Sequence, residues 1–249
     1  MDKNKTLALN AAKARLLGVQ MVHDAASGHP GGSMSCMDVL TALYFDVMNV
    51  DVNDPRNPDR DRFVMSKGHC SPAVYPVLAL KGFFPKEELA TLNRPGTNLP
   101  SHCDMNRTIG IDMTAGSLAQ GFSASVGIAL ACRLDKRDSK VYAIIGDGES
   151  QEGQIWEAAM YAGNQKLSNL IAFCDNNGMQ IDGTTNEINS IEPIADKWTA
   201  FKWNVITCCG HDVEAIDAAI AAAHTETERP TMIILNTVKG KGANFCEGT

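Results

Sequence analysis

The chain has 249 residues, 44% of them hydrophobic and 20% charged, with a formal net charge of -7 and a pI near 5.3. This composition is that of an ordinary globular protein, and its acidic balance offers no basic surface for nucleic acid. No apolar stretch approaches the roughly 20 residues that a membrane-spanning helix needs, so neither nucleic acid nor a membrane is expected as a partner.

The first twenty residues, MDKNKTLALNAAKARLLGVQ, mix charged and apolar residues at helical spacing. They lack the apolar core of a signal peptide, so we expect an amphipathic segment that is retained in the protein. Residues 49–62 contain several Asn and Asp residues beside prolines, which is typical of a surface loop without chemistry.

Apolar, strand-like runs alternate with longer helical patterns along the rest of the chain. Strands are predicted at residues 62–66, 141–145, 170–174, 203–208 and 231–238, and helices at residues 117–134, 151–165 and 213–225. This alternation is typical of a mainly parallel sheet that is covered by helices on both faces. We therefore expect one three-layer α/β domain over residues 1–249, with ligands outside the carboxyl ends of the strands.

The eight cysteines form no CxxC pair and have no regular spacing, and several of them lie inside apolar runs. We expect buried free thiols rather than disulfides or a metal cluster. Because free thiols are typical of a reducing compartment, the expected location is the cytoplasm.

The predicted strand at residues 141–145 runs into the motif Gly146-Asp147-Gly148. The glycines allow a tight turn and a close approach of the backbone to a ligand, and Asp147 offers a hard carboxylate oxygen. Gln151 and Glu152 are expected to open the next helix, whose N-terminal dipole favours a phosphate. Taken alone, the motif is equally typical of an ordinary tight turn.

A second predicted strand, at residues 170–174, ends in the run Asp-Asn-Asn, so Asn177 should reach the same edge of the sheet. Between Gly148 and Asn176 lie residues 149 to 175, which are 27 residues and suffice for one helix and one parallel strand. A carboxylate, an amide oxygen, a main-chain carbonyl, two phosphate oxygens and a water would give Mg²⁺ six oxygen ligands.

This pairing of motifs resembles the binding motif of thiamine diphosphate enzymes. The resemblance implies that Asp147 and Asn177 hold a metal ion that grips the cofactor's diphosphate, with a third ligand from the main-chain carbonyl of Met179. The implied cofactors are thiamine diphosphate and Mg²⁺, for which Ca²⁺ or Mn²⁺ could substitute.

Four further motifs distinguish among the thiamine diphosphate enzymes. They are SGHPGG with His29, SKGHCSP with His69, LPSHCD with His102, and TAGSLAQG with Gly116 and Leu118. Together they resemble the N-terminal, diphosphate-binding half of transketolase, and the match extends over nearly the whole chain.

The resemblance implies a role for each of these residues. His69 and the N–H of Gly148 would contact the diphosphate, while Gly116 and Leu118 would line the aminopyrimidine side. The other two histidines would face the substrate, because an imidazole with a pKa of roughly 6.5 exchanges protons at neutral pH. The predicted catalytic residues are His29, His69 and His102, and the predicted cofactor-binding residues are His69, Gly116, Leu118, Gly148, Asn177 and Lys239.

Two charged residues have weaker assignments. Lys239, in the motif TVKGKG, would approach the cofactor, and a solvated lysine is the alternative. Glu152 resembles a buried acid that links cofactor sites across subunits, and a plain carboxylate at a helix start is the alternative. The remaining histidines match no functional motif and are expected at the surface or the edge of the core; they are His23, His211 and His224.

The implied reaction is the transfer of a two-carbon ketol group from an anionic ketose to an aldose. Complete transketolases carry further domains that bind the aminopyrimidine, supply the activating glutamate and hold the anionic tail of the sugar, and this sequence contains none of them. We therefore expect the N-terminal subunit of a split, two-chain transketolase, assembled as two copies of each chain. Truncation of a longer chain is the other explanation, and a phosphate tail is not distinguished from a sulfonate.

Three alternatives remain open. The α chain of a 2-oxoacid dehydrogenase E1 and deoxyxylulose-phosphate synthase share the metal-binding motif, but differ in the histidine motifs. A non-catalytic cofactor-binding subunit is the third, and the retention of three loop histidines argues against it.

Overall fold

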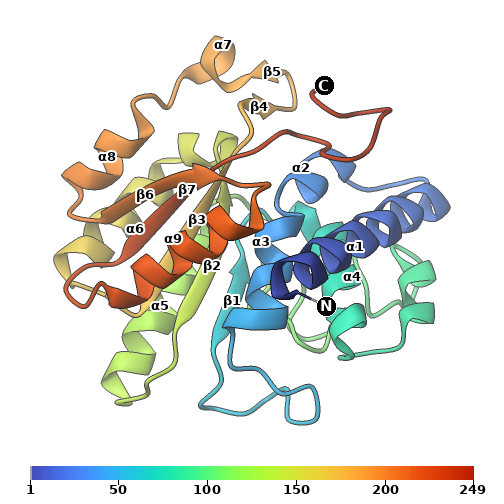
Figure 1. The fold of residues 1–249 in the computed structure, drawn as a ribbon, viewed down its shortest axis with the longest axis horizontal. Coiled ribbons are helices and arrows are strands. Elements are labelled where there is room, and N and C mark those ends of the chain that lie inside the picture. The colour runs from blue at the N-terminus through green and yellow to red at the C-terminus, as the bar shows by residue number, and fades with distance from the viewer. Residues whose placement is uncertain (1) are drawn as a thin grey trace.

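A five-stranded parallel sheet forms the centre of the computed structural model, which describes residues 2–249 (Figure 1). The strand order is β1-β2-β3-β7-β6, and every neighbouring pair is parallel. The strands are β1 (Arg62–Met65), β2 (Val141–Gly146), β3 (Leu170–Asn176), β6 (Asn204–Cys209) and β7 (Thr231–Asn236). All five predicted strands are present, and their carboxyl ends lie along one edge of the sheet.

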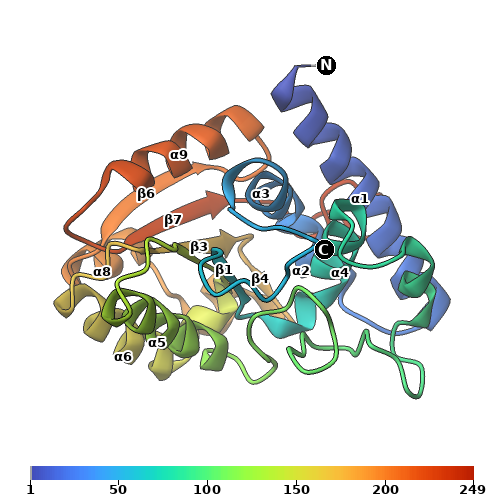
Figure 2. The same cartoon turned by 90° about the horizontal axis from the view of Figure 1, so that it is seen from below.

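Helices cover both faces of this sheet (Figure 2). One face packs against α1 (Lys3–Ala25), α3 (Met37–Ala42), α4 (Ser71–Lys81) and α9 (Val213–Thr225). The other face packs against α5 (Gln120–Leu134), α6 (Gly153–Asn164) and α8 (Ile194–Ala200). The predicted fold class, a three-layer α/β arrangement around a mainly parallel sheet, is therefore confirmed.

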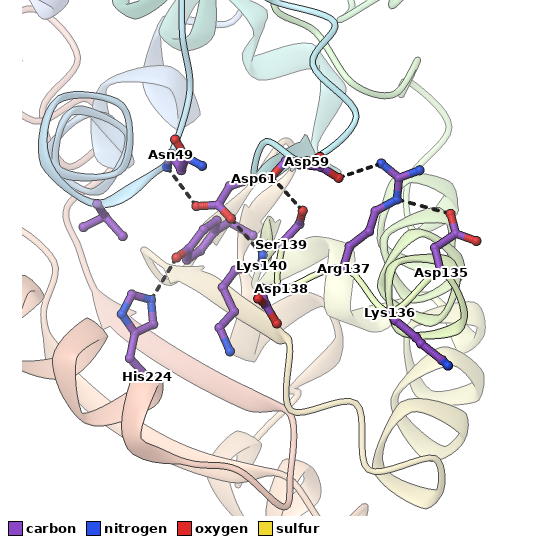
Figure 3. Close-up of a pocket in the computed structure, with 12 residues that line it drawn as sticks. Asn49, Asp59, Asp61, Asp135, Lys136, Arg137, Asp138, Ser139, Lys140 and His224 are labelled. Carbon is purple, nitrogen blue, oxygen red and sulfur yellow. Dashed lines mark hydrogen bonds and ion pairs between the residues drawn. The ribbon is translucent and has the colours of Figure 1, made fainter.

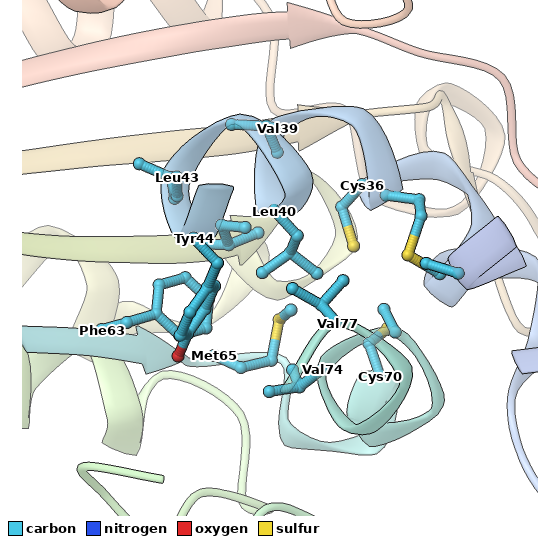
Figure 4. Packing of buried hydrophobic residues seen from close by; sticks show 14 of the residues in the cluster. Cys36, Val39, Leu40, Leu43, Tyr44, Phe63, Met65, Cys70, Val74 and Val77 are labelled. Atoms are coloured by element: carbon cyan, nitrogen blue, oxygen red, sulfur yellow. The ribbon is translucent and has the colours of Figure 1, made fainter. Parts of the chain in front are cut away.

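Successive residues of each strand contribute to different cores. Tyr142 and Ile144 join the core beneath α3 and α4, whereas Ala143 and Ile145 join the core beneath α5 and α6. Both faces of the strand are buried, which is why the strand sequences are continuously apolar instead of alternating with polar residues. Figure 4 shows part of the first core, where side chains of α3 meet those of β1 and α4.

Two predicted helix starts are wrong by a few residues, and both errors fall beside the cavity described below. The helix predicted from residue 117 begins at Gln120, because Ala119 has a left-handed backbone with φ of 69°. The helix predicted from residue 151 begins at Gly153, since residues Gly148–Gln151 form a 3-10 turn, η4, and Glu152 is extended. Gln151 and Glu152 therefore precede the helix instead of opening it.

Several short elements complete the edge of the sheet where the strands end. They are α2 (Pro30–Ser35), η2 (Gly68–Cys70), the hairpin of β4 (Met179–Gln180) and β5 (Gly183–Thr184), and α7 (Thr185–Asn189). Figure 1 shows the hairpin and α7 beyond the carboxyl ends of the strands. The other short elements are a π-helical turn, η1 (Leu43–Val47), which extends α3, and η3 (Lys86–Thr91).

The cysteines are free thiols of different exposure. Cys36, Cys70, Cys103, Cys132 and Cys174 are buried, as predicted. Cys209 is exposed, so the expectation that all the cysteines are buried was wrong. The exposure of Cys209 follows from the position of β6 at the edge of the sheet. Within residues 2–249, none of the helices has the length and apolar character needed to cross a membrane.

Candidate active site

The carboxyl ends of the strands surround a cavity of about 680 Å³. It brings together every residue that the sequence analysis assigned to the metal, the cofactor or catalysis. These lining residues are His29, His69, His102, Gly116, Leu118, Asp147, Gly148, Asn177, Met179 and Lys239. Glu152 also lines this cavity, together with Lys67, Glu149, Gln180 and Ile181.

A second cavity of about 630 Å³ lies at the opposite edge of the sheet, near the start of β2 (Figure 3). Its polar groups largely satisfy one another: Asp61 accepts hydrogen bonds from the backbone of Asn49 and Lys140, and the Tyr142 hydroxyl lies 2.8 Å from Nε2 of His224. None of the predicted site residues lines it. His224 thus lies at the edge of the core, as expected.

Asp147 follows β2 and is nearly inaccessible, with 2% of its surface exposed. Its Oδ1 accepts the N–H of Gly148 at 2.7 Å, and its Oδ2 accepts the N–H of Gly178 at 2.5 Å. Burial, and then the nearby carboxylate of Asp175, raise the pKa of Asp147 to about 6. Removing a carboxylate from water costs free energy, and a bound divalent cation would offset that cost. The burial of Asp147 is therefore consistent with a metal ligand.

Asn177 and Met179 lie in the loop that follows β3. Oδ1 of Asn177 accepts the N–H of Met179 at 3.1 Å, which is an Asx-turn, and Met179 then enters the β4–β5 hairpin. The hydrogen bond from Gly178 to Asp147 joins this loop to the end of β2. The two predicted metal-ligand residues therefore follow adjacent strands and line the same cavity, and both carry side-chain oxygen atoms of the type that Mg²⁺ prefers.

Three histidines surround the cavity from three separate segments. His29 caps the start of α2, His69 lies in η2 and His102 lies in a loop. The rings of His29 and His69 meet edge to face with centroids 5.0 Å apart. A side chain at Gly116 would be in van der Waals contact with the His102 ring at 3.4 Å, so Gly116 and His102 lie side by side on the cavity lining.

The cavity keeps these imidazoles neutral at neutral pH. Burial, and then the positive charge of Lys67, lower the pKa of His69 to about 4. Partial burial, and then the neighbouring His69, lower the pKa of both His29 and His102. A neutral imidazole has one donor and one acceptor nitrogen, so each can hold a hydroxyl or carbonyl group or exchange a proton.

Lys239 and Glu152 both line the cavity. The Nζ of Lys239 donates to the carbonyl of Gln180 at 3.4 Å, and its stem packs where a side chain at Gly31 would clash at 2.9 Å. The Lys239 side chain is thus held against Gln180 and Gly31 and is not freely solvated. Glu152 is exposed just before α6 in this chain, and its expected burial between subunits stays a prediction.

The other two histidines lie outside the cavity. His23 is 81% exposed, and His211 bonds to Asp38 through Nδ1 at 2.9 Å and accepts the N–H of Val238 through Nε2 at 2.9 Å. His211 therefore fastens the segment just before Lys239 at the edge of the core.

Sequence reasoning missed three buried charged residues beneath the site. Lys67 and Asp175 form an ion pair, with side chains 3% and 0% exposed. Glu149 accepts hydrogen bonds from the hydroxyl of Ser66 and the N–H groups of Ala119 and Gly146. Lys67 lies within the SKGH motif, Asp175 within the run Asp-Asn-Asn, and Glu149 directly after Gly146-Asp147-Gly148. These positions were the available signal.

Comparisons with known proteins agree with this geometry. Residues 6–249 match the family model described as transketolase, thiamine diphosphate binding domain. A 6-deoxy-6-sulfo-D-fructose transketolase subunit from Clostridium sp. (strain MSTE9) is 58% identical over 94% of this chain and 85% of its own length. An apulose-4-phosphate transketolase subunit from Phocaeicola vulgatus is 46% identical over 98% of this chain and 86% of its own length.

A solved transketolase from Campylobacter jejuni superposes with a TM-score of 0.94 at 32% identity. The superposition covers all of this chain and 40% of the solved one, so the chain spans less than half the length of that enzyme. The relatives that it matches over most of their length are instead named as subunits. The chain therefore belongs to the transketolase family of transferases, as a thiamine diphosphate-binding subunit of a split transketolase.

Proposed function

We propose that this chain, together with a partner subunit, transfers a two-carbon ketol group from an anionic ketose to an aldose, using thiamine diphosphate and Mg²⁺. One observation carries the proposal: three histidines that are neutral at neutral pH line the same cavity as the buried carboxylate of Asp147 and the amide of Asn177. This combination serves diphosphate binding and proton exchange at once.

Asp147, Asn177 and the carbonyl of Met179 would hold the metal ion. His69 and Lys239 would contact the diphosphate, and so would Gly148, although its N–H donates to Asp147 in this structure. When bound, thiamine diphosphate supplies the electron sink that allows a carbon–carbon bond next to a carbonyl to break.

The protein's own contribution is orientation and proton exchange. His29 and His102 come from different segments on the cavity wall, so they would hold the hydroxyl and carbonyl groups of the ketose from two directions. Their lowered pKa values keep them able to accept a proton at neutral pH. Leu118 and Gly116 would line the aminopyrimidine side.

A partner subunit would supply what this chain lacks. Ile181, which lines the cavity, is 90% exposed, and Glu152, which also lines it, is exposed as well; this fits a site that another chain closes. By analogy with the family we propose two copies of each chain and, from the free thiols, a cytoplasmic location.

The donor substrate would be a ketose with an anionic tail. The relative with 58% identity is named for a sulfonated ketose, and the relative with 46% identity for a sugar phosphate. Both tails carry negative charge, so both belong in the test.

The test is a ketol-transfer assay of this chain purified with and without the partner subunit, with 6-deoxy-6-sulfo-D-fructose and a ketose phosphate as alternative donors. We expect transfer only with both chains, Mg²⁺ and thiamine diphosphate. Asp147→Ala should lower it by about 100-fold or more. Asp138→Asn, an exposed change in the second cavity, is the matched control and should leave it unchanged. Cofactor binding by the complex without turnover of either donor would instead support a non-catalytic subunit.

A further inference from the structure

A buried ion pair joins Lys67, which lines the cofactor cavity, to Asp175, which does not. Asp175, near the end of β3, is fully buried, and Nζ of Lys67 contacts its Oδ2 at 2.5 Å. The two side chains are 3% and 0% exposed, so each is the close ionic partner that the other needs when it is removed from water.

The pair reaches α2, the helix that directly follows His29. Lys67 donates to the carbonyl of Gly32 at 2.8 Å, and the hydroxyl of Ser35 donates to Asp175 at 2.5 Å. Both contacts fall within α2, a six-residue helix without a capping hydrogen bond at its start, so its placement depends on such outside contacts.

The pair also reaches the other three walls of the cavity. Lys67 lies two residues before His69, at the end of β1. Nδ2 of Asn177 donates to Oδ2 of Asp175 at 3.4 Å. The hydroxyl of Thr237, which precedes Lys239 by two residues, donates to Oδ1 of Asp175 at 2.5 Å.

Four separate segments thus converge on two buried charges, and each segment carries one of the proposed site residues. We propose that the Lys67–Asp175 pair is a positioning pair that fixes the cofactor-binding and substrate-binding segments relative to one another. Fold stability alone does not account for it, because a buried ion pair contributes little net stability once desolvation is included. Directional bonds to four segments, by contrast, fix geometry. This inference rests on the proposed function.

A second buried ion pair provides a matched control. Arg60 and Asp112 have side chains that are each 4% exposed, and Asp112 also accepts the N–H of Phe63 at the start of β1. This pair lies at the amino end of β1, away from the cavity, and none of its residues lines that cavity. Asp175→Asn and Lys67→Met are therefore compared with Asp112→Asn and Arg60→Met, all in the complex with the partner subunit.

The first readout is hydrogen exchange in the absence of cofactor. In Asp175→Asn we expect faster exchange in all four segments at once, residues 29–35, 67–70, 176–180 and 237–240. The second readout is calorimetric affinity for thiamine diphosphate at saturating Mg²⁺, which should weaken by roughly 10- to 100-fold, as for other residues that orient metal ligands. Asp112→Asn should lower the melting temperature while leaving that affinity within about twofold.

The proposal would be overturned if the variants of both ion pairs lost the same melting temperature, kept the wild-type cofactor affinity and showed no faster hydrogen exchange in the four segments. If Asp175→Asn does not fold, Thr237→Val decides. It keeps the side-chain shape but removes one donor, and should weaken cofactor affinity and speed exchange at residues 237–240, with residues 29–35 unaffected. An unchanged affinity in that variant also overturns the proposal. Failure of the wild-type complex to bind the cofactor with Mg²⁺ would instead count against the proposed function.

Discussion

His69 lines the cavity with an imidazole that can form hydrogen bonds, but its surroundings oppose protonation of the ring. It lies in the turn between β1 and α4, where burial and the fixed charge of Lys67 lower its pKa to about 4, from an ordinary value of 6.5. In the unfolded chain the imidazole takes up a proton near pH 6.5, whereas in the folded chain it does so only near pH 4. The folded state therefore binds fewer protons between these values, and its stability falls as the pH falls through this window.

Replacing this histidine should remove that pH dependence. In urea denaturation of the cofactor-free chain between pH 6.5 and 4, we expect His69→Gln to lose about 2 kcal/mol less stability than the wild type. His29 and His102 have pKa values shifted in the same direction, mainly by their own burial, and this part of their shift is present in both proteins and cancels in the difference. Parallel stability curves for the two proteins would show that His69 titrates normally.

At the scale of elements, the position of α6 depends on one close backbone contact. A side chain at Gly163 would lie 1.9 Å from the carbonyl oxygen of Phe201, which follows α8. Only glycine lets α6 approach this segment so closely. The same helix begins directly after Glu152, which lines the cavity, so its packing also determines one part of the site.

Gly163→Ala should therefore destabilise the chain by about 2–3 kcal/mol, because the added methyl group forces α6 and α8 apart. Gly127→Ala in α5 is the matched control. Nothing lies within 4 Å of a side chain at Gly127, so alanine there should be neutral or stabilise by up to about 1 kcal/mol through helix propensity. Thermal and urea denaturation of both variants test this contrast, which equal effects of the two substitutions would contradict.

The long elements could be predicted from the sequence, since their signal is local. A strand such as β2 is apolar throughout because both of its faces are buried, and α9 has apolar residues at helical spacing. The six-residue helix α2 and the β4–β5 hairpin have no such signal. Their stability comes from contacts with distant segments, for example the bond from Lys67 to Gly32.

The same distinction separates the site residues. His29, His69 and Asp147 were identified from motifs that can be read in one stretch of sequence. Asp175 and Lys67 were missed because nothing local shows that a charged side chain is buried; that depends on a partner 108 residues away. The burial of Glu149 behind Asp147 was missed for the same reason.

At the scale of the whole molecule, the cavity opens at the edge of one chain. Its floor is built from the ends of β1, β2 and β3, while its outer wall includes the exposed Ile181 of the hairpin. A cofactor bound here would be held by the metal and diphosphate contacts of this chain, with its remaining surface covered only in the assembled enzyme. The stabilisation that a ligand confers depends on its affinity for the folded state, so this chain and the complex should respond differently.

We expect thiamine diphosphate with Mg²⁺ to stabilise the complex by about 2.7 kcal/mol at 100 times its dissociation constant, and to stabilise the isolated chain much less. Removal of the metal with EDTA should abolish the increase in melting temperature, because the charge on Asp147 would then oppose the diphosphate. Mn²⁺ or Ca²⁺ should restore much of it. Thiamine, which has no diphosphate, is the control and should have no metal-dependent effect. An increase of the same size with thiamine diphosphate in EDTA would mean that Asp147 and Asn177 do not act through a metal ion.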